Sequence, residues 1–418
     1  MEALDQPIPN TRRLSQKLTR IGFHSVFVGA FAMLGGALRG FNLLLVLAAL
    51  MVGALIMQWR WSRRSLERIT TRRTLPSEFI AGRRTSIKYQ IQNLSGWIPA
   101  WMLRIEDSIQ SDDASLSETI STGVPLVEPR SIRISSPDIR FSKRGRYRLS
   151  GIRVMTGFPF SLSTSILNDT QPEEIIVYPE LYPLKRNWRR QLTHLGAGNS
   201  MQRRRQGPAE GEFYGLRGWK NGDSLRWIHW RTSARIGELA VRQFEHQRRL
   251  DVCIVLDAWI EANENISDDS NHVEAAVSLA ATLTNEIATG SNDQVALVCI
   301  AATSELIRGS GGGDHIARRM LESLADAKAS STPDWESALR QCEGQGVRAK
   351  QMLVISSRTH SDFKETHTAE AKKLEDWSRR GTLHWLDVRT DLSRWVQAPA
   401  KSIATGSTST NVEVSYAE

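Results

Sequence analysis

The residues most capable of chemistry lie in one stretch, residues 211–245, which reads GEFYGLRGWKNGDSLRWIHWRTSARIGELAVRQFE. Tryptophan and arginine are interspersed in it, and a Gly-Asp pair marks a turn. Arginine stacked on an indole ring gives a rigid, partly buried surface, and these two residue types dominate protein-binding hot spots. Aromatic rings beside basic groups also stack on bases and hold phosphates. The stretch is therefore a seam between domains, a protein-binding site or a nucleic-acid site.

We expect seven residues of this motif to form the partner-binding site or the structural seam. They are Arg217, Trp219, Gly222, Asp223, Arg226, Trp230 and Arg235. Gly222 tolerates a positive φ, and Asp223 is near enough to pair with Arg226 or another arginine of the motif. The run from Leu225 to Trp230 alternates as a strand would. We rank the seam first and the protein partner close behind. Nucleic acid is a distant third, because no recognisable nucleic-acid module is present.

Enzyme motifs are missing from the sequence. It contains no Gly-x-Ser-x-Gly elbow, no His-Glu-x-x-His and no Walker sequence. Cys253 and Cys299 lie in apolar, strand-like runs, and Cys342 lies in a helical pattern with no obvious histidine partner. We therefore expect no catalytic residue and no cofactor, and an undetected hydrolase assembled from distant residues stays an alternative.

Positive charge is concentrated in one part of the chain. The formal net charge is +9, and Lys185–Leu250 holds fifteen Lys or Arg against five Asp or Glu. Such a block indicates an anionic partner, whether nucleic acid, lipid headgroups or an acidic protein face. A solvated basic connector is the competing interpretation.

Two apolar runs near the N-terminus, residues 21–38 and 41–59, are each long enough to cross a bilayer. As helices they would span about 27 Å, close to the roughly 30 Å hydrocarbon core. Basic residues precede the first run and follow the second, which keeps both flanks in the cytoplasm. The sequence therefore predicts a cytoplasmic tail over 1–20 and a two-helix transmembrane hairpin over 21–59. Most of the chain would then lie on the cytoplasmic side of an inner membrane.

The periodicity then divides the rest of the chain into four segments. Residues 70–182 show polar–apolar alternation, including a strand pair around a Ser150-Gly151 turn, and predict an antiparallel β-sandwich. Residues 183–248 form a basic connector that contains the motif. Residues 249–396 alternate strands and helices, which predicts a doubly wound, mostly parallel α/β sheet whose ligands bind beyond the strand ends. Residues 397–418 are small and polar and are expected to be disordered.

These features together resemble the bacterial membrane-anchored proteins that carry the von Willebrand factor A-like "domain of unknown function 58". The motif carries the closest resemblance, from Gly211-Glu212-Phe213 through Gly222-Asp223 to Ser233-Ala234-Arg235. The paired N-terminal helices, RGRYRLSGIRV with GFPFSL, and a buried strand ending at Asp257 extend it. The resemblance implies a von Willebrand A-like fold for the C-terminal part.

That fold typically binds a divalent cation through Asp-x-Ser-x-Ser, a threonine and a further aspartate, which are oxygen ligands that magnesium prefers. Here residues 257–261 read DAWIE, so the carboxylate remains and both serines are missing. Thr332 could supply the threonine, and Ser357 stands where the second aspartate is expected. Asp257 and Thr332 are thus the remnants of a degenerate site. We expect no metal, and we interpret Asp257 as a strand-end or helix-capping carboxylate.

The resemblance also implies partners. Similar proteins look like partners of MoxR-type AAA+ ATPases and are suspected of assisting the assembly or maturation of other proteins. We therefore expect a non-enzymatic, membrane-bound adaptor or scaffold that works with such an ATPase and with membrane-associated proteins. A basic nucleic-acid or anionic-lipid binding module is the alternative.

Overall fold

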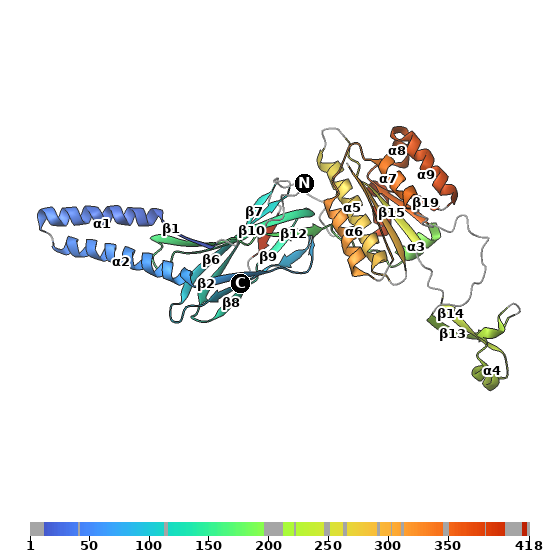
Figure 1. Cartoon of the computed structure of the whole chain (residues 1–418), viewed down its shortest axis with the longest axis horizontal. Coiled ribbons are helices and arrows are strands. Elements are labelled where there is room, and N and C mark those ends of the chain that lie inside the picture. The colour runs from blue at the N-terminus through green and yellow to red at the C-terminus, as the bar shows by residue number, and fades with distance from the viewer. Residues whose placement is uncertain are drawn as a thin grey trace. The chain divides into compact units, whose positions relative to one another are not determined.

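The computed structural model describes residues 12–40, 42–112, 116–195, 212–220, 223–245, 251–261, 266–290, 293–301, 303–310, 313–345, 351–380, 382–397 and 412–415. The chain forms two compact units (Figure 1). The first contains the residues up to Leu181, and the second begins at Tyr182. Each unit has a buried apolar core of its own.

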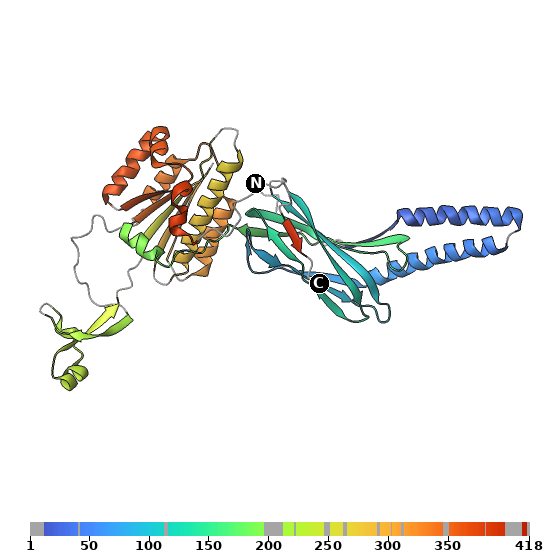
Figure 2. The ribbon, with the colours of Figure 1, turned by 180° about the vertical axis from the view of Figure 1, so that it is seen from behind.

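The N-terminal helices are α1 (Arg20–Arg39) and α2 (Asn42–Glu67), which lie side by side in both views (Figures 1 and 2). Both are long and apolar enough to cross a membrane, as expected. Most of their large apolar side chains are exposed, as in Leu43. α2 continues beyond the expected end at residue 59, because its last turns bury Ser62 and Leu66 in the first unit.

The tail expected over residues 1–20 contains a strand that the sequence did not indicate. β1 (Arg12–Leu18) pairs antiparallel with β11 (Ser163–Asp169), with Leu18 opposite Ser163. Because β1 is short and mostly polar, its sequence pattern cannot be distinguished from that of a solvated tail. Its strand conformation is set by the hydrogen bonds that it forms with β11.

The first unit is built from one seven-stranded and two three-stranded sheets. The large sheet adds five strands to β1 and β11: β3 (Phe79–Ile80), β6 (Ala100–Ser111), β7 (Ser117–Val127), β10 (Gly145–Thr156) and β12 (Glu173–Tyr178). The small sheets contain β2 (Ile69–Thr74), β5 (Lys88–Asn93) and β8 (Ile132–Ser135), and β4 (Arg84–Ser86), β9 (Asp138–Phe141) and β20 (Val412–Ser415). The described pairings are antiparallel except for β12 with β3.

Alternating side chains from these sheets meet in a single apolar core, in agreement with the alternation in the sequence. Two details differ from expectation. Ser150-Gly151 is no turn: β10 runs through it with a register shift between Leu149 and Ile152, and Gly151 adopts φ 149°. In the tail expected to be disordered, the described residues Val412–Ser415 form β20, which pairs with β9.

An ion pair is buried inside this apolar core. Arg73 Nη1 and Asp107 Oδ2 are 2.6 Å apart, with side chains 1% and 0% exposed. Tyr89 donates its hydroxyl to the same oxygen at 3.1 Å. Burial, and then the charge of Asp107, raise the pKa of Tyr89 far above its usual range, so the phenol stays protonated.

The second unit contains a five-stranded sheet in the order β17-β16-β15-β18-β19. Its strands are β15 (Asp251–Asp257), β16 (Gln294–Ile300), β17 (Ser304–Ser310), β18 (Gln351–Ser356) and β19 (Thr382–Asp387). Its helices are α3 (Trp188–Leu195), α5 (Ile266–Ala288), α6 (Asp314–Asp326), α7 (Trp335–Gly344), α8 (His360–Thr366), α9 (Thr368–Arg380) and α10 (Val388–Trp395). Every pair in the sheet is parallel except β16 with β17.

The mostly parallel α/β sheet is thus confirmed. Residues Val252–Asp257 of β15 are buried, as in a strand covered on both faces. Cys253 and Val255 belong to one buried cluster with side chains of α7, α8 and α9, while α5 also contacts β15. The sequence indicated neither the antiparallel edge strand β17 nor the short helices α8 and α10.

Candidate functional site

The carboxyl edge of the sheet contains the point at which the strand order reverses. β15 has β16 on one side and β18 on the other, so the connections after β15 and β18 lead to opposite sides. In such sheets ligands bind in the crevice beyond this edge. Asp257 ends β15 and Ser356 ends β18, and the two residues are opposite one another in the register.

Asp257 is fully buried, and both of its carboxylate oxygens accept hydrogen bonds. Oδ1 accepts from Trp335 Nε1 at 3.0 Å, and Oδ2 accepts from Ser356 Oγ at 2.8 Å. Arg358 faces the same carboxylate, with Nε 2.9 Å from Oδ2 and Nη2 3.4 Å from Oδ1. An arginine 101 residues along the chain therefore neutralises the charge of Asp257.

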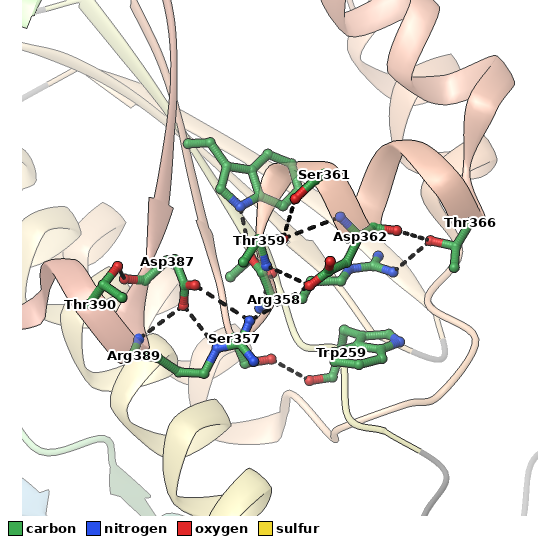
Figure 3. A network of polar contacts seen from close by, with 12 residues as sticks. Trp259, Ser357, Arg358, Thr359, Ser361, Asp362, Thr366, Asp387, Arg389 and Thr390 are labelled. Atoms are coloured by element: carbon green, nitrogen blue, oxygen red, sulfur yellow. Dashed lines mark hydrogen bonds and ion pairs between the residues drawn. The ribbon is translucent and has the colours of Figure 1, made fainter.

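Arg358 is itself held on all sides. Its guanidinium lies over the rings of Trp259 and Phe363, at 5.1 and 5.0 Å from the ring centroids. Nη1 donates to Thr366 Oγ1 at 3.2 Å, and the Arg358 carbonyl accepts from Trp385 Nε1 at 2.9 Å (Figure 3). The side chain is 1% exposed. Cation–π contacts and hydrogen bonds thus compensate the desolvation of this charge.

A second set of polar contacts positions α8, which carries Phe363. Thr359 and Asp362 form a capping box at the start of α8. Arg389 bonds Asp387 at 3.1 Å and lies 3.9 Å from Asp362, so it joins the start of α8 to the end of β19 (Figure 3). These contacts fix the position of α8 and therefore of the Phe363 ring that packs on Arg358.

The residues at this edge do not fit a divalent cation. Thr332 is exposed, and its N–H donates to Ser330 Oγ at 3.2 Å. Ser357 donates its hydroxyl to the carbonyl of Trp259 at 2.6 Å. Across the described residues, no group of three or more His, Cys, Asp or Glu could hold a metal ion. A second cation on Asp257 would also have to displace the guanidinium of Arg358.

Of the two alternatives for Asp257, a strand-end or a helix-capping carboxylate, the structure shows the first. It ends β15, but it bonds side chains across the sheet edge and caps no helix through the contacts described. Arg358 was missed as its partner. The available signal was an arginine directly after the buried strand LVISS, placed where parallel strands bring residues beside the end of the first strand.

Two thiols and one imidazole of this unit have pKa values shifted toward their neutral forms. Burial raises the pKa of Cys342 to about 11 and that of Cys253 well above its usual range. Burial also lowers the pKa of His367, which the nearby charge of Arg358 lowers further. A protonated thiol is a poor nucleophile, so neither of these two cysteines resembles an activated one.

The Trp/Arg motif forms a small element of its own. β13 (Glu212–Gly218) and β14 (Ala240–Glu245) pair antiparallel, and η2 (Leu225–Trp227) and α4 (Trp230–Ile236) lie between them. Leu225–Trp230 is therefore helical over most of its length, and its expected alternation as a strand is wrong. Ser224 and His229 cap the two helices, and these local hydrogen bonds override a weak pattern.

A bidentate ion pair fixes this hairpin motif, as the sequence suggested, but its arginine is Arg217. Nη1 and Nη2 of Arg217 donate to Asp223 Oδ2 and Oδ1 at 2.6 and 2.7 Å. The N–H of Lys220 donates to Oδ2 at 2.8 Å. Gly222 lies outside the described residues. The pair links the end of β13 to the turn before η2.

The hairpin motif buries a few aliphatic groups and exposes its larger side chains. Ile228 and Val241 are buried. Trp230 is 64% exposed and Leu225 67% exposed, while Trp219 is 37% exposed. Arg226 and Arg235 are exposed as well. The hydrogen bonds described for residues 212–245 run within the segment, so its fold is set locally while its largest side chains stay exposed.

We expect the carboxylate of Asp223 to titrate near pH 2. The hydrogen bonds from Arg217 and from the N–H of Lys220 lower its pKa to about 2, against roughly 3.9 in an unfolded chain. Because the folded value is the lower one, the pair supports the hairpin above about pH 4 and loses this support as the pH falls through 2. Carboxyl carbon chemical shifts measured against pH would show the midpoint. A midpoint near 4 would contradict the bidentate pair.

Part of the chain matches a known family model, and a curated protein is similar to about two thirds of it. Residues 215–375 match the family model described as "Protein of unknown function DUF58". The "Uncharacterized protein YeaD" of Bacillus subtilis is 23% identical over 278 residues, which is 65% of this chain and 65% of that protein. The chain thus matches slightly less than two thirds of the relative's length.

Two solved structures are only weakly similar to parts of the chain. A β-glucosidase from Listeria innocua is 16% identical with a TM-score of 0.18, and the match covers 26% of this chain and 16% of that one. An alkylpurine DNA glycosylase from Pseudomonas fluorescens is 10% identical with a TM-score of 0.19, covering 38% and 46%. Neither likeness reaches a common fold. The stretch from the hairpin motif through most of the α/β unit is therefore similar to a family whose function is unknown.

Proposed function

We propose that this protein is a membrane-anchored, non-enzymatic adaptor. It would sit in the inner membrane through α1 and α2, with the bulk of the chain in the cytoplasm. Its α/β unit would be a von Willebrand A-like domain without a metal. It would couple a MoxR-type AAA+ ATPase to membrane-associated proteins during their assembly or maturation.

The exposed side chains of the hairpin motif carry the proposal. Trp230, Leu225, Arg226 and Arg235 are all exposed within this short segment, and such residue types make binding hot spots when a partner desolvates them. The Arg217–Asp223 pair fixes the turn before η2, which lowers the entropy cost of binding. Exposed arginines fit a partner with an acidic surface.

The sheet edge supports the same proposal from another direction. The guanidinium of Arg358 takes the place of a cation on Asp257, and the neighbouring rings close over it. Recognition by this unit would therefore use its surface, without a metal at the strand ends. The order of the mostly parallel sheet is compatible with a von Willebrand A-like domain.

We expect Trp230→Ala to reduce capture of the AAA+ ATPase by about 30-fold, as truncating a hot-spot aromatic costs ~2 kcal/mol or more. Affinity purification of the full chain in mild detergent after nuclease treatment, with mass spectrometry, measures this. The melting temperature should stay unchanged because the side chain is largely exposed. Ile134→Ala, at an exposed apolar side chain of the first unit, is the control and should leave capture intact.

The outcome also separates a seam from a binding site. Ile228→Ala removes a buried side chain of the hairpin motif and should lower both stability and capture. If Trp230→Ala behaves like Ile228→Ala, the motif is a seam. If Trp230→Ala leaves capture unchanged, the adaptor surface lies elsewhere.

A second candidate is a basic nucleic-acid or anionic-lipid binding module. Exposed Arg226, Arg231 and Arg235 lie in the same short segment as exposed Trp230, a combination that suits stacking on bases and contact with phosphates. Binding through phosphates alone collapses as salt rises. Tight binding of single-stranded nucleic acid that persists near physiological salt would favour this candidate over the adaptor.

A further inference from the structure

One end of the first unit exposes a group of large apolar side chains. Its members are Trp59, Leu94, Trp97, Trp101, Met102 and Phe160, which we call the apolar rim. Trp97 is 72% exposed, Met102 65% and Phe160 51%. Single exposed apolar residues need no explanation, but aromatic residues gathered at one end of a domain mark a binding surface.

The apolar rim lies where the two N-terminal helices leave the unit. Thr19, which caps α1, donates its hydroxyl to the carbonyls of Ser161 and Leu162 at 2.7 and 2.9 Å. On α2, the buried Gln58 donates to the carbonyls of Gly157 and Ser163 at 3.0 and 2.8 Å. The loop 157–162, which carries Phe160, is thus bonded to both helices.

The start of β6 belongs to the same end. Thr156, next to that loop, donates its hydroxyl to the carbonyl of Trp101 at 2.8 Å, and the Trp101 ring stacks on Phe158 with 5.6 Å between centroids. Alternation along a strand would turn Trp101 and Met102 to opposite faces. Met102 instead adopts φ 50°, and both side chains end up exposed. This strained backbone conformation is a cost that a role in binding would explain.

The loop after β5 completes the apolar rim. The N–H of Leu94 donates to the carbonyl of Arg68, directly after α2, at 2.9 Å. The loop then leads within six residues to Ala100, where β6 begins, so Trp97 lies between these two points. Exposed arginines flank the rim, including Arg60, Arg68 and Arg130.

The helix pair is docked tightly against the unit at this level. A Cβ at Gly22 would lie 1.9 Å from the carbonyl oxygen of Leu162, so α1 packs there as only glycine allows. From Arg20, α1 runs for 20 residues, about 30 Å, which matches the hydrocarbon thickness. A bilayer spanned by α1 would therefore have its boundary beside Thr19, next to Phe160.

We propose that the apolar rim is a second membrane contact, which inserts into the boundary between headgroups and acyl chains of the bilayer that α1 and α2 cross. This inference rests on the proposed membrane anchoring. Tryptophan is favoured at that boundary because its ring is apolar and its N–H is polar. The flanking arginines suit anionic headgroups. The rim and the helices together would fix the orientation of the first unit on the membrane.

Site-directed spin labelling of the full chain tests this proposal. The three cysteines are buried, so single labels can be placed by Trp97→Cys, Met102→Cys and Phe160→Cys. Leu47→Cys reports the apolar N-terminal half of α2. Glu174→Cys, at a 67% exposed side chain next to the other half of β10, is the matched control. The protein is reconstituted in nanodiscs of phosphatidylcholine and phosphatidylglycerol, and collision with oxygen and with a water-soluble nickel chelate is measured.

Labels at 97, 102 and 160 should collide more with oxygen than with the chelate, as in lipid, and the label at 174 should show the reverse. If the label at 47 reports lipid while the rim labels behave like 174, the rim proposal is wrong and the anchoring stands. If the label at 47 also reports water, the anchoring itself fails. Rim labels shielded from both reagents would indicate a contact between copies of the chain, which also overturns the proposal.

Discussion

Replacing Arg358 by alanine is expected to destabilise the α/β unit by about 3–5 kcal/mol, because the carboxylate of Asp257 would be left buried without its counter-charge. Both side chains are almost fully buried, with Nε and Oδ2 2.9 Å apart. Hydrogen-exchange mass spectrometry of the full chain in detergent measures the change separately for β15 and β18. Their amides should exchange faster by roughly two to three and a half orders of magnitude, since ~1.4 kcal/mol is tenfold.

Two controls make this result specific. Arg340→Ala breaks an exposed pair with Glu336 on α7 and should cost at most about 1 kcal/mol. The double variant Asp257→Leu with Arg358→Met removes both charges and should recover much of the lost stability. Exchange in β15 no faster for Arg358→Ala than for Arg340→Ala would show that the pair does not hold the sheet edge. Restoration of the Arg358→Ala variant by magnesium would revive a metal site at Asp257.

Replacing Arg73 by alanine should have a comparable effect on the first unit, about 3–5 kcal/mol. Arg73 is the ion-pair partner of buried Asp107 and also donates to the carbonyl of Gln171 at 2.6 Å. Tyr89 would remain as a donor to Asp107, but a neutral hydroxyl does not balance the charge. Faster exchange in β5 and β6, with β15 unchanged, is the expected signature.

Arg148→Ala is the matched control for this second prediction. Its pair with Glu174 spans 3.5 Å between exposed side chains on neighbouring strands of the same sheet. Loss of such a pair should stay within about 1 kcal/mol. Equal effects of Arg73→Ala and Arg148→Ala would mean that the buried pair adds little to the stability of this core.

Long segments with strong periodicity were predictable from the sequence. The apolar runs of α1 and α2, and the alternation of β5 and of much of β10, follow from hydrophobic burial alone. The buried run of β15 and the helical pattern of α5 likewise indicated a mostly parallel sheet. These patterns extend over many residues, so several side chains report the same element.

Short or polar segments were not predictable. β1 is a polar strand whose partner β11 lies about 150 residues away, and β17 is an edge strand with little apolar content. Leu225–Trp230 shows an alternation too short to separate a strand from a helix, and the caps at Ser224 and His229 decided it. Pairing with a partner strand determines β1 and β17, and local capping hydrogen bonds determine Leu225–Trp230.

The two ion pairs of the candidate sites also differ in how far the sequence could predict them. Asp223 and Arg217 are six residues apart, so the sequence by itself indicated that a motif arginine would pin the turn, although it left open which one. Asp257 and Arg358 are 101 residues apart, and only the pairing of β15 with β18 brings them together. Sequence alone determined that Asp257 ends a buried strand. The tertiary structure decided that a guanidinium is its counter-charge, because a buried carboxylate takes its partner from whichever strand packs beside it.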